Sequence, residues 1–119
     1  MKPKSSDPIV CRSSDISAIQ TAHSSGTKKI LMGGEQTGNA ITQIALGKLQ
    51  VGEEVEMHQH TTMKEYFYFT SGEGVYTINE VEHALSAGTF VMIPEQTPHS
   101  LKSTGQEPLQ FFYFGVATE

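Results

Sequence analysis

Short apolar runs separated by turn-forming residues are the feature of this sequence that most limits its fold. From Lys28 onward, runs of roughly four to eight residues recur, and Gly, Pro, Asn or Ser interrupts them about every eight to twelve residues. This spacing is typical of an all-β sandwich or barrel and not of alternating strands and helices. We predict strands over residues 28–32, 41–50, 54–60, 65–70, 74–79, 82–85, 89–93, 98–103 and 109–116.

The first part of the chain has a different character. Residues 1–27 are polar and rich in Ser, and we expect them to form an irregular segment that packs on the barrel or extends from it. One short helical turn is expected over residues 15–19, with Ser13 or Ser14 as its cap. Residues 28–119 are expected to form one domain, since a chain of 119 residues can bury one hydrophobic core without disulfides.

Composition narrows the class of protein. Eight Lys and Arg against thirteen Asp and Glu give a net charge of −5, and no basic cluster marks a phosphate-binding surface, so we expect no nucleic-acid partner. No run approaches the ~18 apolar residues of a membrane span, and the N-terminus lacks the apolar stretch of a secretory signal. The single cysteine, Cys11, has no intrachain partner and is expected to be a free thiol. We therefore expect a soluble, cytoplasmic protein.

Histidine and glutamate side chains occupy positions from which they could meet a metal ion. His58 and His60 are two residues apart in a predicted strand, so both side chains leave the same face about 6.5–7 Å apart. Two imidazole nitrogens can then bind one ion at about 2.0–2.1 Å. Glu65 shares its face with Phe67 and Phe69, where a carboxylate is costly to bury without a positive partner. A divalent cation would be such a partner, and the alternative is a chance pair of surface imidazoles.

The other histidines differ in their surroundings. His99 follows Pro98 at the start of a predicted strand and could supply a further ligand from a neighbouring strand. His23 and His83 have no comparable neighbours and are expected to face solvent.

The spacing of the residues around these histidines is specific. One run consists of Gly52, five residues, His58-Gln59-His60, four residues, Glu65, six residues and Gly72. Fifteen residues later a second run consists of Gly88, five residues, Pro94, four residues and His99. The two runs resemble the first and second signatures of the cupin superfamily, and the resemblance covers about residues 41–116.

The resemblance implies a small double-stranded β-helix, which is a jelly-roll-like barrel. It also implies one divalent ion (Mn, Fe, Co, Ni, Cu or Zn), with one or two positions left for water or substrate. Its ligands would be His58, His60, Glu65 and His99.

The function implied by the resemblance is that of a metal-dependent enzyme acting on a small oxygen-rich molecule. Dioxygenase-type and sugar- or keto-acid-isomerase-type chemistry fit equally well, and a non-catalytic ligand-binding or sensing module is the alternative. No catalytic base can be assigned. Tyr76 and Tyr113 are candidates for that role and Gln96 for an orienting donor, with purely structural roles as the alternative.

Two positions depart from the second signature, and one turn is well marked. Gln96 stands where the family usually has Gly, so this turn either avoids positive φ or adopts it at some strain. Ser103 stands where the family usually has Asn. The Ser71-Gly72-Glu73-Gly74 segment predicts a hairpin turn, because two glycines can supply positive φ.

The cavity wall and a possible partner surface follow from strand alternation. The segment 111–114 is apolar on both faces, so a further layer is expected to cover one of them. That layer is either a second copy in a homodimer, as in many small cupins, or residues 1–27. Tyr66 and Tyr68 are expected to face outward or into that interface. The residues expected to line the cavity are Val55, Met57, Phe67, Phe69, Phe90, Met92, Leu101, Phe111 and Tyr113, and the candidate substrate contacts are Phe67, Phe69, Gln96, Leu101 and Tyr113.

Overall fold

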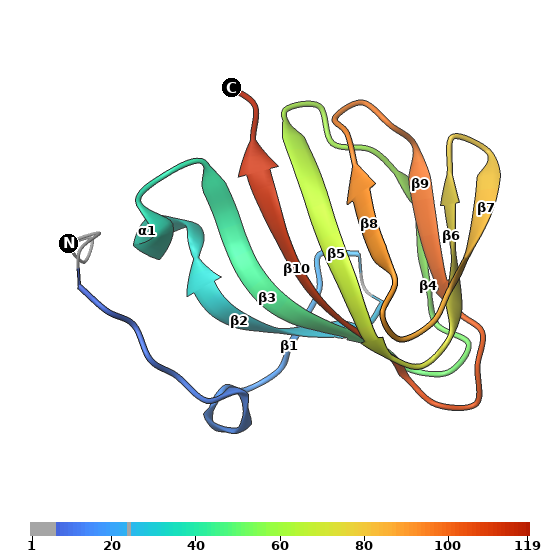
Figure 1. Ribbon diagram of the computed structural model, residues 1–119, viewed down its shortest axis with the longest axis horizontal. Helices are drawn as coiled ribbons and strands as arrows, with labels where there is room; N and C mark the ends of the chain where they lie inside the picture. Colours follow the sequence, from blue (N-terminus) through green and yellow to red (C-terminus); the bar gives the residue numbers. More distant parts are fainter. Residues whose placement is uncertain (1–6, 24) are drawn as a thin grey trace.

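Two antiparallel β-sheets form the body of the protein (Figure 1). The computed structural model describes residues 7–23 and 25–119. One sheet has six strands in the order β1-β2-β3-β10-β5-β8, and the other has four in the order β4-β9-β6-β7. The strands are β1 (Ile19–Gln20), β2 (Thr27–Gly33), β3 (Ile41–Leu49), β4 (Glu54–His58), β5 (Met63–Ser71), β6 (Gly74–Ile78), β7 (Val81–Leu85), β8 (Phe90–Ile93), β9 (His99–Ser103) and β10 (Leu109–Ala117).

The all-β jelly-roll architecture predicted from the sequence is confirmed. The nine predicted strands correspond to β2–β10, but β1 and the one-turn helix α1 (Gly34–Thr37) were not predicted. Neither element has an apolar repeat that the sequence could reveal. The helical turn expected over residues 15–19 is instead a 3₁₀ turn at Ser13–Asp15, and Ile19 belongs to β1.

The hydrophobic core lies between the facing sides of the two sheets, which we call the inner faces. In β5, Phe67 and Phe69 point inward with exposed fractions of 5% and 0%, whereas Tyr68 between them is 47% exposed. This alternation is the one predicted, and burying each phenylalanine contributes about 1.5–3 kcal/mol. The buried core comprises Leu49, Phe67, Phe69, Tyr76, Leu85, Ile93, Leu101, Leu109 and Phe111.

The prediction that Met57 lines the cavity is wrong. The pairing of β4 with β9 shifts register between Val55 and His58, which is the mark of a β-bulge. A bulge adds one residue to one strand and changes the side to which the next residues point. Val55 is therefore half-buried in contact with the core, while Met57 is 53% exposed.

The prediction for β8 is wrong by one residue. Phe90 pairs with Tyr68 and Met92 pairs with Tyr66, which are the outward residues of β5. Paired residues in adjacent strands share a face, so Phe90 and Met92 lie outside, with exposed fractions of 61% and 41%. The inward residues of β8 are Val91 and Ile93.

The structure settles the conformation of the two marked turns. Gly72 has a φ of 83°, as predicted, but Gly74 does not have positive φ. Gly74 is needed for a different reason, because a Cβ there would lie 2.5 Å from the carbonyl oxygen of Lys102. Of the two possibilities for Gln96, positive φ is the observed one, at 57°.

The segment before β1 runs outside the body of the two sheets (Figure 1). Apart from Ile16, residues 7–20 are exposed, and Val10 has an exposed fraction of 89%. The segment meets the six-stranded sheet at Lys29, whose Nζ donates a 2.9 Å hydrogen bond to the carbonyl oxygen of Ser13.

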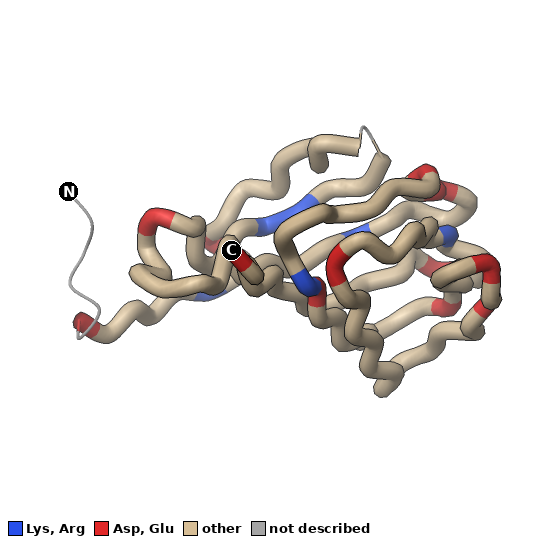
Figure 2. Tube along the Cα trace, turned by 90° about the horizontal axis from the view of Figure 1, so that it is seen from above, with Lys and Arg blue, Asp and Glu red and all other residues tan. Residues whose placement is uncertain are grey.

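Charged residues are spread over the described trace. Lys and Arg occur along it without forming a basic cluster on one face among the described residues (Figure 2). Within that same part of the chain, no helix is long and apolar enough to cross a membrane.

Candidate metal centre

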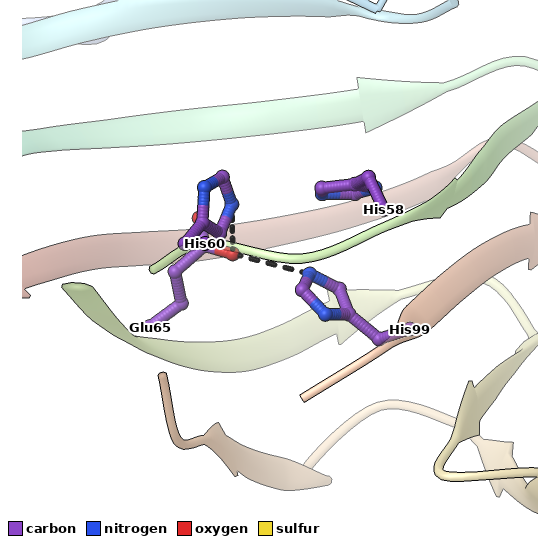
Figure 3. A group of neighbouring side chains, drawn as sticks. All are labelled: His58, His60, Glu65 and His99. Carbon is purple, nitrogen blue, oxygen red and sulfur yellow. Dashed lines mark ion pairs between the residues drawn. The ribbon is translucent and has the colours of Figure 1, made fainter. Parts of the chain in front are cut away.

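Four side chains converge between the two sheets (Figure 3). His58 ends β4, His60 follows it in the loop, Glu65 lies in β5 and His99 begins β9. One ligand atom from each lies within 4.8 Å of those of the other three. Two atoms that bind one ion at about 2.1 Å each lie at most about 4.2 Å apart. Small side-chain movements would therefore bring all four into the bonding range of a single ion.

Backbone carbonyl groups orient two of the imidazoles. The Nδ1 atom of His99 lies 2.7 Å from the carbonyl oxygen of Thr97, and Nδ1 of His58 lies 2.8 Å from that of Glu56. A carbonyl oxygen only accepts hydrogen bonds, so Nδ1 carries the proton and Nε2 keeps its lone pair. This is the arrangement by which proteins fix a histidine that binds metal through Nε2.

The Nε2 atom of His99 has no hydrogen-bond partner among the described residues, although His99 is only 1% exposed. It faces Oε1 of Glu65 at 3.5 Å. A lone pair opposite a carboxylate oxygen is repulsive, and an unsatisfied buried polar atom costs about 1–3 kcal/mol. A second proton on His99, at Nε2, would form a hydrogen bond to Oε1 of Glu65, but it would also place a positive charge on a buried ring. A divalent cation between them satisfies both without that charge.

The carboxyl group of Glu65 is held in its ionised form. Its side chain is 12% exposed, and this burial by itself raises the pKa. The hydrogen bond with the His60 imidazole, together with the His99 imidazole when its Nε2 carries a proton, outweighs burial and lowers the pKa of Glu65 to about 2. The Nε2 atom of His60 lies 3.1 Å from Oε1 of Glu65, and this hydrogen bond raises the pKa of His60. A carboxylate that stays ionised at neutral pH can act as a metal ligand.

His23 lies against this group, which no motif in the sequence predicts. His23 and His83 are both exposed, as predicted. However, the ring centroid of His23 is 4.2 Å from that of His58, and His23 lines the same cavity as His58 and His60. Burial and the nearby imidazoles of His60 and His99 lower its pKa. The contact depends on how the loop between β1 and β2 crosses the cavity, for which the local sequence carries no signal.

A cavity of about 210 Å³ adjoins the four side chains. Three of the predicted substrate contacts, Phe67, Leu101 and Tyr113, line it. The other two do not. Phe69 is completely buried in the core, and Gln96 lies in the turn between β8 and β9. The backbone N–H of Gln96 donates a 2.6 Å hydrogen bond to the carbonyl oxygen of His60. The cavity is also lined by Thr21, Ala22, His23, Ser25, Thr27, Lys28, Gln43, Gly47, Lys48, Leu49, Val55, Met63, Tyr76 and Phe111.

The two tyrosines of the cavity remain protonated at neutral pH. Burial and the charge of Glu65 raise the pKa of Tyr113 to about 12 and that of Tyr76 well above its ordinary value. Both hydroxyl groups are therefore hydrogen-bond donors and poor general bases.

The chain shares its sequence pattern and fold with known proteins. Residues 45–115 match the family model of the cupin domain. The chain is 30% identical over 108 residues to the oxalate-binding protein of Thermotoga maritima. The aligned region covers 87% of this chain and 89% of that protein. It is 32% identical over 60 residues, half of this chain, to an uncharacterised protein of Methanocaldococcus jannaschii, and spans 48% of that protein.

Its structure also has a counterpart of similar length. The crystal structure of a predicted oxalate decarboxylase from Thermotoga maritima superposes with a TM-score of 0.84 and 27% identity, over 92% of this chain and 99% of that one. The family match over residues 45–115 agrees with the two spaced signatures and with the jelly-roll sheets. This chain therefore belongs to the cupin family.

Proposed function

We propose that this protein is a metal-dependent cupin in which His58, His60, Glu65 and His99 bind one divalent ion and a small oxygen-rich molecule binds to that ion. The observation that carries the proposal is the buried Nε2 atom of His99, which faces the Glu65 carboxylate and has no hydrogen-bond partner among the described residues. The chemistry of three imidazoles and one carboxylate suits Mn, Fe, Co, Ni, Cu and Zn.

The size and position of the cavity limit the molecule that it can take. Four protein ligands leave one or two coordination positions free, and the cavity beside them has a volume of about 210 Å³. When bound, the ion would supply Lewis-acid polarisation of a bound oxygen or, if redox-active, electron transfer. The protein's own groups would orient the molecule, since Tyr113 is a neutral donor at this cavity.

Two versions of this function remain distinct. The first is an enzyme with dioxygenase-type or sugar- or keto-acid-isomerase-type chemistry. The second is a binding module without turnover. It is supported by the relative from Thermotoga maritima, which is an oxalate-binding protein.

The metal site is tested by binding and stability together. The protein is analysed for metal as purified, stripped with chelator and titrated with each of the six ions by calorimetry. We expect one ion per chain and a stabilisation of about 2.7 kcal/mol when the free ion is at 100 times its Kd. His58→Ala should lower the Tm of the loaded protein but not of the stripped one. His83→Ala, which replaces an exposed imidazole outside the group, should change neither.

Equal Tm values for loaded and stripped forms of both the native protein and His58→Ala would contradict the metal site. Turnover is examined next on the loaded protein. Oxygen uptake with thiols, diketones and catechols on the iron form, or isomerisation of sugars or keto acids, supports the enzyme. Tight binding without turnover supports the binding module.

We also propose that the protein acts as a homodimer that associates through the outer face of the six-stranded sheet. Residues that pair across β3, β10, β5 and β8 place aromatic and aliphatic side chains side by side on this face. Tyr66 stacks on Phe114 with ring centroids 4.9 Å apart. On β5 and β8, the outward side chains of Tyr68, Phe90 and Met92 have exposed fractions of 47%, 61% and 41%. The surface comprises Ile44, Leu46, Tyr66, Tyr68, Phe90, Met92, Phe112 and Phe114.

A second copy fits this surface better than the chain's own first segment does. Ser13 and Ala18 lie beside Leu46, over the β2–β3 end of the face, and residues 7–12 are exposed, with the apolar Ile9 and Val10 among them. When two copies pair about a two-fold axis, the apolar residues of the first segment of one copy can pack on the exposed apolar face of the other copy.

Light scattering after gel filtration measures the oligomeric state. The native chain should have the mass of two copies, and Phe90→Lys should have the mass of one. Met57→Lys introduces the same charge at a similarly exposed methionine of the other sheet and should remain dimeric. A monomer for the native chain at all concentrations, or dissociation by Met57→Lys but not by Phe90→Lys, would contradict this interface.

A further inference from the structure

A lysine without a carboxylate partner lines the cavity beside the candidate metal centre. Lys28 of β2 pairs with Gly47, which in turn pairs with Phe111 on the inner face. The Lys28 side chain is half-buried and belongs to the cavity wall. Its Nζ donates a 3.2 Å hydrogen bond to Oε1 of Gln43, and no described carboxylate forms an ion pair with it. A partly buried ammonium group with only a neutral partner needs a further negative group for full compensation.

The polar groups of this wall are connected. Gln43, which accepts the hydrogen bond from Lys28, also acts on the Tyr113 hydroxyl, where it partly offsets the rise in pKa that burial and the charge of Glu65 cause. Lys28, Gln43 and Tyr113 thus form a line of polar groups along the six-stranded sheet that ends beside the four converging side chains. His23, at the mouth of the same cavity, feels the charges of both Lys28 and Glu65.

The total charge of the loaded cavity indicates the ligand. Three neutral imidazoles, one carboxylate and one divalent ion sum to +1, and the ammonium group of Lys28 brings the sum to +2. In a chain with thirteen acidic and eight basic residues, this is a local excess of positive charge. A ligand with two negative charges neutralises it when one charged end binds the ion and the other accepts a hydrogen bond from Lys28.

We infer that Lys28, supported by Gln43, forms an anion-binding subsite that makes the cavity selective for short dicarboxylates over monocarboxylates. This inference rests on the proposed metal site, since the first carboxylate binds the ion. The volume of about 210 Å³ restricts the ligand to a short carbon chain.

The test compares two neighbouring lysines. Metal-loaded protein is titrated with oxalate, malonate, succinate and the monocarboxylate glycolate. Lys28→Met removes the charge and keeps most of the side-chain volume, and Lys28→Arg retains the charge. Lys29→Met is the control, because Lys29 pairs with Leu46 of the outer face and bonds to the backbone of Ser13.

In the native protein at least one dicarboxylate should bind more tightly than glycolate. Lys28→Met should weaken the binding of that dicarboxylate by about 10- to 100-fold, which is the loss expected for one charge-assisted hydrogen bond. The Kd values of glycolate and of the metal should remain unchanged. Lys28→Arg should recover part of the affinity, and Lys29→Met should bind like the native protein.

The experiment distinguishes a wrong metal site from a wrong Lys28 subsite. If no ion binds to the native protein, the proposed function is rejected and the subsite with it. If the ion binds but Lys28→Met keeps the native preference among carboxylates, only the subsite is rejected. A loss of dicarboxylate binding in Lys29→Met equal to that in Lys28→Met would also reject it, because the effect would then reflect the general charge of the sheet.

Discussion

The two faces of β5 differ in chemistry although they share one backbone. Glu65, Phe67 and Phe69 point inward, where they contribute a candidate metal ligand and part of the core. Tyr66 and Tyr68 alternate with them and point outward, and Tyr68 is 47% exposed. Since the side-chain period of a strand is two, a register shift of one residue would exchange the two sets. The packing that fixes the core therefore also fixes the position of Glu65, the candidate metal ligand.

The largest contrast between the faces should appear in two adjacent truncations. Phe69→Ala removes a side chain with no exposed surface and should lower the free energy of unfolding by about 3–5 kcal/mol. Tyr68→Ala, one residue away, should lower it by less than about 1 kcal/mol in the monomer, because half of that ring is already in contact with water. Urea unfolding at protein concentrations at which light scattering gives the mass of one copy measures both values. Equal losses would show that the faces do not differ in packing.

A substitution that adds volume should sharpen the contrast. Gly47 faces Phe111 across the strand pair, and a Cβ at Gly47 would overlap the Phe111 ring. Gly47→Ala should therefore lower the free energy of unfolding by about 1–3 kcal/mol through overpacking. Gln110→Ala changes the residue before Phe111, which is exposed and does not line the cavity, and serves as the control. Thermal unfolding of both variants decides the matter, and a neutral Gly47→Ala would mean that the inner face has room to spare.

The smallest expected effect is a pH dependence confined to the inner face. The pKa of His60 is raised above its ordinary 6.5 by Glu65, so its stabilising contribution is complete below pH 6.5 and is lost as the pH rises through the folded-state value. The pKa values of His23 and His58 are lowered, mainly by burial, so their contribution is lost as the pH falls below 6.5. Metal-free protein should be most stable near pH 6.5, with differences below about 1 kcal/mol after solvent screening.

Metal should reverse the upper part of this profile. Because ligand imidazoles must be neutral, the loaded protein should gain stability as the pH rises above 6.5. Urea midpoints between pH 5 and 8.5, with chelator and with metal, measure both profiles, and His60→Gln should flatten the upper limb of the metal-free one. A metal-free protein that becomes more stable between pH 6.5 and 8 would contradict the ion pair between His60 and Glu65.

The sequence predicted more about the centre of the molecule than about its edges. Turn residues at regular spacing located nine strands, and spaced signatures identified four residues that the structure brings together. The errors arose where one strand meets another. The bulge opposite β9 turns Met57 outward, and the pairing of Phe90 with Tyr68 sets which side of β8 is buried. Such choices depend on contacts between distant segments, which alternation within one strand cannot determine.

The same reason explains why His23 and Lys28 were not predicted as cavity residues. Neither belongs to the spaced signatures, and the segment around them is polar. Lys28 reaches the cavity because β2 pairs with β3, and His23 reaches it because its ring lies against that of His58. Only the order of strands in the sheet brings them to the cavity.

The backbone hydrogen bond from Gln96 to His60 has a consequence for how the centre responds to strain. The turn that contains Gln96 leads through Thr97, whose carbonyl oxygen holds the ring of His99. One short loop therefore contacts both the backbone of His60, in the loop after β4, and the ring of His99, in β9. A displacement of this loop would move both rings in concert, so much of the entropy lost in assembling the centre is already spent when the chain folds.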